Sequence, residues 1–180
     1  MEGRSAVFSA VTLHGSIPEP GSAPRGEGGF TLVELVIAVL IVGILAAIAV
    51  PSYLRYLEKN KEATAISDIN IIASRLAGLT VEGALPTNLA QINIGNTLSL
   101  IDPWGNPYQY FPIYGHLADH SYMNGARKDH NLHPINSDFD LYSMGPDGES
   151  HKPLQNAISR DDIIRANDGA FVGKASTYDP

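Results

Sequence analysis

The sequence predicts an α+β protein in which a long N-terminal helix packs on a small antiparallel β-sheet. An apolar run from Phe30 to Val50 contains one charged residue, Glu34, and an amphipathic pattern follows it. Short aromatic segments between turn-forming residues fill the second half of the chain. These patterns divide the chain into a leader at 1–29, a membrane-spanning helix at 30–50, an amphipathic helix at 51–82 and a soluble sheet domain, the head, at 83–180.

The composition narrows the class of protein. The chain has 180 residues, a formal net charge of -7 and no cysteine. Proteins that bind nucleic acids usually present a basic face, so this charge argues against a nucleic-acid partner. Without cysteine, no disulfide can cross-link the fold and no thiolate can bind a metal ion.

Residues 1–29 form the predicted leader. They are rich in Gly, Pro and Ser and show no hydrophobic periodicity, so we do not expect them to belong to the fold. An ordinary secretory signal is cut after its apolar segment, whereas here the long apolar run follows the leader. We therefore expect the run to stay in the mature chain.

The run from Phe30 to Val50 predicts a membrane-spanning helix. It is apolar on all sides, and at about 1.5 Å per residue it covers the roughly 30 Å hydrocarbon core of a bilayer. A carboxylate inside such a span costs about 2.5 kcal/mol or more, so Glu34 is expected to have a partner. If the chain is cut after Gly29, Phe30 gains a free amine, and Glu34 of a neighbouring copy can pair with it. The alternative is a tolerated acid near the lipid headgroups.

The helix is expected to continue beyond the span. Pro51 lacks a backbone donor and should bend it, while Tyr53 and Tyr56 lie where an interfacial aromatic belt is expected. We expect Gly78, Gly83 and Pro86 to end it. Apolar residues at three- and four-residue intervals give it one face for the head to cover: Ile66, Ile69, Ala73, Leu76 and Leu79.

The head is expected to supply the sheet. The strands predicted from β-prone and aromatic residues are Tyr108–Tyr114, Phe139–Ser143 and a short third one at 170–172. The polar segment 115–137 predicts a surface loop, and Trp104 is expected to anchor the core.

The N-terminal residues resemble a known family. Gly29-Phe30-Thr31-Leu32-Val33-Glu34-Leu35, the apolar run and Pro51-Ser52-Tyr53 resemble the start of type IV pilins and type II secretion pseudopilins. The resemblance implies that a prepilin peptidase cuts between Gly29 and Phe30 and methylates the new amine. It also implies a helical filament in whose assembly Phe30, Glu34 and Pro51 take part.

Residues of the head carry a second resemblance. The segments 102–108 (DPWGNPY), 139–148 (FDLYSMGPDG) and 161–163 (DDI) are similar to the major pseudopilin of type II secretion. The segment 115–137 is longer than its counterpart there, and the usual Asn-Trp pair after Asp-Ile is missing.

This second resemblance implies a structural subunit that drives export of folded proteins across the outer membrane. The chain would wait in the inner membrane as a single-pass protein, surrounded by lipid, with its head in the periplasm. It would then enter a periplasmic pseudopilus with further copies and other pseudopilins. A membrane platform and its ATPase would drive assembly.

A calcium site is expected in the head. Ca²⁺ takes six to eight oxygen ligands, and the family binds it in the corresponding loop. Asp147, Asp161 and Asp162, with Ser143, are the candidate ligands. The alternative is that these are solvated acids on loops, one of them capping a helix that begins at Ile163.

The same sequence leaves two alternative functions open. A major or minor type IV pilin, working in adhesion, motility or DNA uptake, shares the N-terminal motif, although such pilins usually end in a loop bounded by Cys. An enzyme lacks support, because no catalytic motif is present. The spacings of His116 and His120, and of His130 and His133, occur in zinc sites, but we read these residues as ordinary loop histidines.

Overall fold

The computed structural model describes residues 29–81, 85–92, 99–130 and 132–179. The predicted leader, apart from Gly29, lies outside these residues. The chain divides into two units, Met1–Ile44 and Leu45–Pro180.

One continuous helix, α1 (Leu32–Val81), contains both predicted helical segments, and it passes through Pro51. Among the described residues, α1 is the one helix that is long and apolar enough to cross a membrane. The side chains from Phe30 to Val50 are exposed, as a lipid-facing segment requires. The helix continues past Gly78, so the prediction that this glycine helps to end it was wrong; Gly83 lies outside the described residues.

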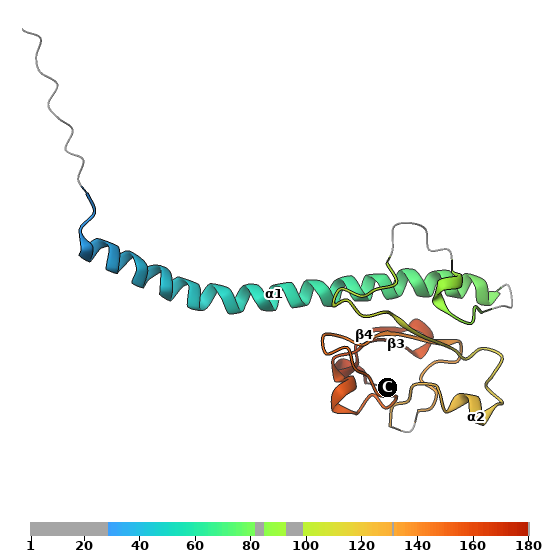
Figure 1. The fold of residues 1–180 in the computed structure, drawn as a ribbon. Helices are drawn as coiled ribbons and strands as arrows, with labels where there is room; N and C mark the ends of the chain where they lie inside the picture. Colours follow the sequence, from blue (N-terminus) through green and yellow to red (C-terminus); the bar gives the residue numbers. More distant parts are fainter. Residues whose placement is uncertain (1–28, 82–84, 93–98, 131, 180) are drawn as a thin grey trace, which may run out of the picture. The chain divides into compact units, whose positions relative to one another are not determined.

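The head contains a four-stranded antiparallel sheet in the order β1-β2-β3-β4 (Figure 1). Strand β2 (Phe139–Ser143) has the predicted bounds, whereas β1 (Gln109–Pro112) and β4 (Phe171–Lys174) differ from theirs by a few residues. Strand β3 (Ile163–Ala166), which pairs with both β2 and β4, was not predicted. All four of its residues are buried, so it lacks the alternation of apolar and polar residues that marks a strand in a sequence.

The second half of α1 lies along one face of this sheet (Figure 1). The predicted helix face includes Ile69 and Leu76, which are fully buried, and Ile66 and Ala73, which are partly buried and pack against the same core. The prediction missed Ala65 and Ile72, which are also fully buried. The core that these residues form contains Tyr108, Phe139, Leu141 and Ile163 from the head, with Trp104 packed at its edge. The pilin-like α+β architecture is therefore confirmed.

Segment 115–137, predicted to be a surface loop, is partly buried. It contains the short helix α2 (His120–Met123), which Asp119 caps through its carboxylate. Met123 and Ala126 pack with Ile113 in a small second core. The prediction was wrong in part because polar residues of this segment, Arg127 and Asn136, pair with buried groups elsewhere in the head, among them Asp140 and Asp162.

Short 3₁₀ helices connect the remaining elements. They are η1 (Leu89–Gln91), η2 (Ala157–Arg160), η3 (Asn167–Gly169) and η4 (Ala175–Thr177).

Candidate functional site

Glu34 has a partner within its own chain. Its Oε2 atom accepts hydrogen bonds from the backbone N of Thr31 at 2.9 Å and from Oγ1 of Thr31 at 2.7 Å. In return, the backbone N of Glu34 donates to Oγ1 of Thr31 at 3.2 Å. This reciprocal pattern is a capping box, which the Thr-x-x-Glu spacing could have revealed in the sequence. It satisfies the carboxylate in a single chain, before any second chain is present.

Phe30 lies directly before this cap and is 88% exposed. The prediction that its amine pairs with Glu34 of another copy concerns two chains and stays a prediction. The same holds for cleavage after Gly29 and for the part of Pro51 in assembly.

Three acidic residues of α1 connect the helix to the head. Glu58 accepts a hydrogen bond from Nε1 of Trp104 at 2.7 Å, and Asp68 accepts one from the Tyr108 hydroxyl at 2.8 Å. Glu62 forms an ion pair with Lys174 at 2.8 Å. Burial, reinforced by the hydrogen bond to Asp68, raises the pKa of Tyr108, so this phenol stays protonated and remains a donor. These polar contacts fix the head to α1 beside the apolar core.

Two of the four predicted calcium ligands have other partners. Ser143 is buried; its hydroxyl donates to the carboxylate of Asp102 and accepts from the backbone N of Gly145. Asp162 is fully buried and pairs with Arg127. These two side chains therefore stabilise the fold itself.

The structure brings the other two predicted ligands, Asp147 and Asp161, close together. Gly145 has a φ of 68°, and a side chain there would lie 2.6 Å from the Asp161 carbonyl oxygen, so the turn can approach Asp161 only with glycine. Partial burial, followed by the charge of Asp147, raises the pKa of Asp161. Asp147 is exposed, and its Oδ1 accepts from the backbone N of Glu149 at 2.9 Å.

These two carboxylates supply the oxygen donors that calcium prefers. The described residues contain no group of three or more His, Cys, Asp or Glu side chains arranged to hold a metal ion. A calcium site here would therefore need backbone carbonyls and water beside Asp147 and Asp161, and it stays a prediction.

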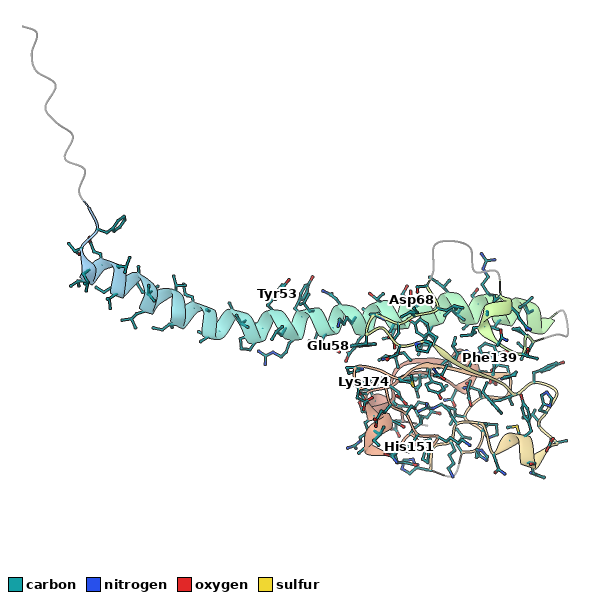
Figure 2. All side chains as sticks on the ribbon, in the orientation of Figure 1. Tyr53, Glu58, Asp68, Phe139, His151 and Lys174 are labelled. Atoms are coloured by element: carbon teal, nitrogen blue, oxygen red, sulfur yellow. The ribbon has the colours of Figure 1, made fainter. Side chains whose placement is uncertain are left out.

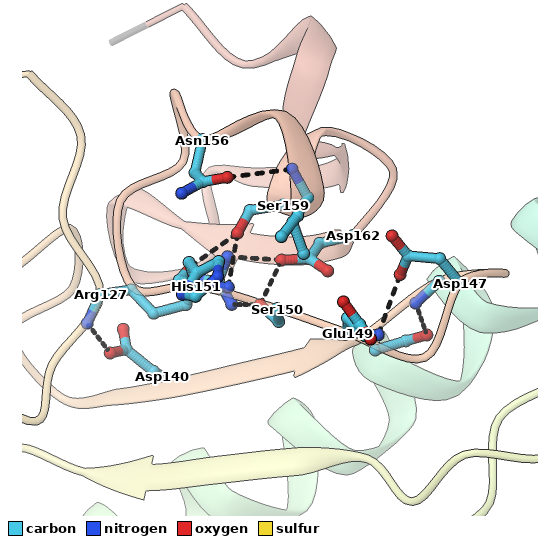
Figure 3. A network of polar contacts seen from close by, with 12 residues as sticks. Arg127, Asp140, Asp147, Glu149, Ser150, His151, Asn156, Ser159 and Asp162 are labelled. Carbon is cyan, nitrogen blue, oxygen red and sulfur yellow. Dashed lines mark hydrogen bonds and ion pairs between the residues drawn. The ribbon is translucent and has the colours of Figure 1, made fainter.

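Sequence reasoning missed a buried polar network around Arg127 (Figure 3). The Arg127 guanidinium lies 2.6 Å from Oδ2 of Asp162 and 2.7 Å from the hydroxyl of Ser150, and it stacks over the Tyr142 ring at 4.0 Å. The backbone N of Arg127 donates to the buried carboxylate of Asp140 at 2.6 Å. The network attaches segment 115–137 to strand β2 and to Asp162, the residue directly before strand β3.

Burial raises the pKa of Asp162 to about 6, although Arg127 and Ser150 act in the opposite direction. Its Oδ1 atom and Nε of Arg127 are buried without a hydrogen-bond partner among the described residues. Burial also raises the pKa of Asp140. The charge on Asp162 is therefore stabilised by Arg127 while being excluded from water.

Two of the histidines considered for a zinc site, His116 and His130, have other partners. His116 stacks on Tyr122 with ring centroids 4.1 Å apart, and Nδ1 of His130 lies 2.8 Å from the Asp129 carboxylate. Nothing in these positions supports a zinc site.

The chain is similar to known proteins at both its apolar segment and its head. Residues 24–50 match the family model described as the prokaryotic N-terminal methylation motif. The type II secretion system core protein G of Pseudomonas aeruginosa is 33% identical over 144 residues, which cover 69% of this chain and 87% of that protein. The protein of the same name from Vibrio cholerae is 35% identical over 104 residues, or 48% and 71% of the two chains.

A fimbrial protein of Pseudomonas aeruginosa is 39% identical over 59 residues, which cover 33% of this chain and 38% of that protein. No solved structure matched the chain significantly.

Proposed function

Because the chain belongs to the family of the type II secretion system core protein G, we propose that it is the structural subunit of a pseudopilus that drives export of folded proteins. The main support for this proposal is the length of the similarity to the Pseudomonas aeruginosa protein. The match covers 87% of the relative's length, and it reaches well beyond the 27 residues, 24 to 50, of the methylation motif. The head as well as the apolar segment is therefore shared.

The exposed apolar side chains of α1 and the methylation motif fit a membrane-anchored protein. We propose a single-pass protein of the inner membrane with its head in the periplasm. A prepilin peptidase would cut between Gly29 and Phe30 and methylate the new amine. A membrane platform and its ATPase would then move the subunit into a periplasmic filament with further copies and other pseudopilins.

The capping box supports a specific role for Glu34 in this assembly. While the subunit is a monomer in the membrane, Thr31 satisfies the carboxylate. In the filament, the Phe30 amine of a neighbouring copy would supply a full positive charge, which a hydroxyl and an amide do not. We expect the variant E34Q to be cleaved normally but to assemble poorly, and normal filaments of E34Q would remove Glu34 from this role.

Calcium binding is part of the proposal. Asp147 and Asp161 are the proposed carboxylate ligands, supported by their proximity and by the close turn at Gly145. We propose no catalytic activity, since the relatives are named for secretion and fimbriae.

A type IV pilin is the second candidate, and the similarity to fimbrial protein favours it to a lesser extent. That match covers only a third of this chain, against 69% for the secretion relative. Deletion of the gene in its own bacterium distinguishes the two functions. We expect exported proteins to be retained in the periplasm, with export restored by the wild-type gene. Normal export together with lost surface piliation or twitching would instead support the pilin.

A further inference from the structure

One face of α1, just after the apolar run, carries basic and hydroxyl side chains. Ser52, Arg55, Tyr56 and Lys59 have the spacing i, i+3, i+4 and i+7, which places them on the same face of a helix. All four are exposed, and Tyr56 is 61% exposed. The Ser52 hydroxyl donates to the Ile48 carbonyl and accepts a hydrogen bond from Arg55 at 3.5 Å. This surface, the Ser52–Lys59 face, therefore presents a guanidinium, an ammonium and the Tyr56 hydroxyl to its surroundings.

The acidic side chains of the same stretch have partners in the head. Glu58 and Glu62 follow Arg55 at i+3 and i+7 and so border the Ser52–Lys59 face. Glu58 accepts a hydrogen bond from Trp104, and Glu62 forms an ion pair with Lys174. Figure 2 shows Glu58 on the head side of α1 and Tyr53 on the opposite side. In the part of the chain that the structure describes, neither base of the Ser52–Lys59 face forms an ion pair. Its positive charge is therefore available to a partner.

The position of this face in the sequence indicates the partner. The apolar run ends at Val50, so a helix that spans a bilayer leaves the hydrocarbon core just before Ser52. From Ser52 to Lys59 the helix rises about 10 Å, while the headgroup layer on one side of a bilayer is roughly 5–8 Å thick. Long basic side chains extend readily to that layer, and tyrosine is favoured there.

We propose that the Ser52–Lys59 face binds the phosphate groups of anionic phospholipids in the leaflet on the head side. The inference rests on the membrane anchoring proposed above. Arginine pairs with phosphate through two parallel hydrogen bonds, and lysine adds a point charge. A lipid is favoured over an acidic protein because the same helix, by continuing into the span, keeps this face beside lipid headgroups.

Energy transfer from Trp104 can test the proposal, because it is the one tryptophan in the chain and it binds Glu58 beside this face. The full chain is reconstituted into phosphatidylcholine vesicles that contain trace dansyl-labelled lipid, either phosphatidylglycerol or phosphatidylcholine. We expect transfer to favour the anionic label. The variant R55Q/K59Q should lose this preference by about fivefold for each base, since each contributes about 1 kcal/mol at an anionic surface.

The control variant K128Q/R160Q removes two exposed bases of the head and changes the net charge equally. It should keep the preference of the wild type. Equal transfer to both labels in the wild type, or an equal loss in the control, would overturn the proposal. If R55Q/K59Q stopped filament assembly while the wild type showed no lipid preference, the face would belong to an acidic protein surface instead. Absence of transfer to either label would contradict membrane anchoring itself.

Discussion

Replacing Arg127 by methionine would leave Asp162 as a buried carboxylate without its cation. The two side chains are 3% and 0% exposed, and Nη2 lies 2.6 Å from Oδ2. Removing one member of such a buried pair costs about 3–5 kcal/mol. In a domain of this size, about 1 kcal/mol lowers Tm by roughly 3–5 °C, so we expect R127M to melt about 10–25 °C below the wild type.

The loss of stability in R127M should also depend on pH. The pKa of Asp162 is raised to about 6 by burial. A carboxyl whose pKa is higher in the folded than in the unfolded state favours folding at low pH, and this contribution is lost as the pH rises through the folded pKa. Without Arg127, the ionised carboxylate of Asp162 is still less favourable in the folded state. The difference in the free energy of unfolding between R127M and the wild type is therefore expected to grow from about pH 4 to about pH 7.

Urea unfolding of the full chain in detergent micelles, followed by Trp104 fluorescence, measures this difference. R160M is a matched control, because Arg160 is exposed and its loss should cost less than about 0.5 kcal/mol. The double variant R127M/D162N removes both charges and should recover most of the stability. A loss below about 1 kcal/mol in R127M, or one that is the same at both pH values, would refute the role assigned to this ion pair.

Three further changes test other parts of the structure. E58A removes the hydrogen bond to the indole, so we expect a loss of about 1.5–3 kcal/mol and a red shift of the tryptophan emission. I72A opens a cavity in the core and should cost about 2–5 kcal/mol, whereas I71A, at a 45% exposed position, should cost little; urea unfolding distinguishes them. If calcium binds as proposed, it should raise the Tm of the wild type but not that of D147N/D161N, and an equal rise in both would contradict the ligand assignment.

The sequence predicted best those elements whose pattern follows from local physical chemistry. The unbroken apolar run required a long exposed helix, and α1 extends from Leu32 to Val81. The aromatic and β-prone segment at Phe139–Ser143 is strand β2. The predicted helix face included Ile69 and Leu76 but was off by a fraction of a turn, because polar residues such as Asp68 also lie near the head and blur the apolar pattern.

The residues that were missed depend on contacts between distant parts of the chain. Strand β3 is buried along its whole length, so its pattern resembles that of a short helix as much as that of a strand. Arg127 and Asp162 are far apart in the sequence, and nothing local indicates that they pair inside the head. The prediction of Asp162 and Ser143 as calcium ligands rested on their expected loop positions and on the family resemblance, which do not reveal the partners that the fold gives them. The Thr31–Glu34 cap, by contrast, was readable from its spacing.

The proposed function depends first on processing of the N-terminus, since only cleavage after Gly29 gives Phe30 the amine that Glu34 would meet in a filament. Intact mass and N-terminal sequencing of the protein isolated from its own membranes measure this directly. We expect a chain that begins at N-methylated Phe30. A membrane form that still carries residues 1–29 would contradict the proposed assembly.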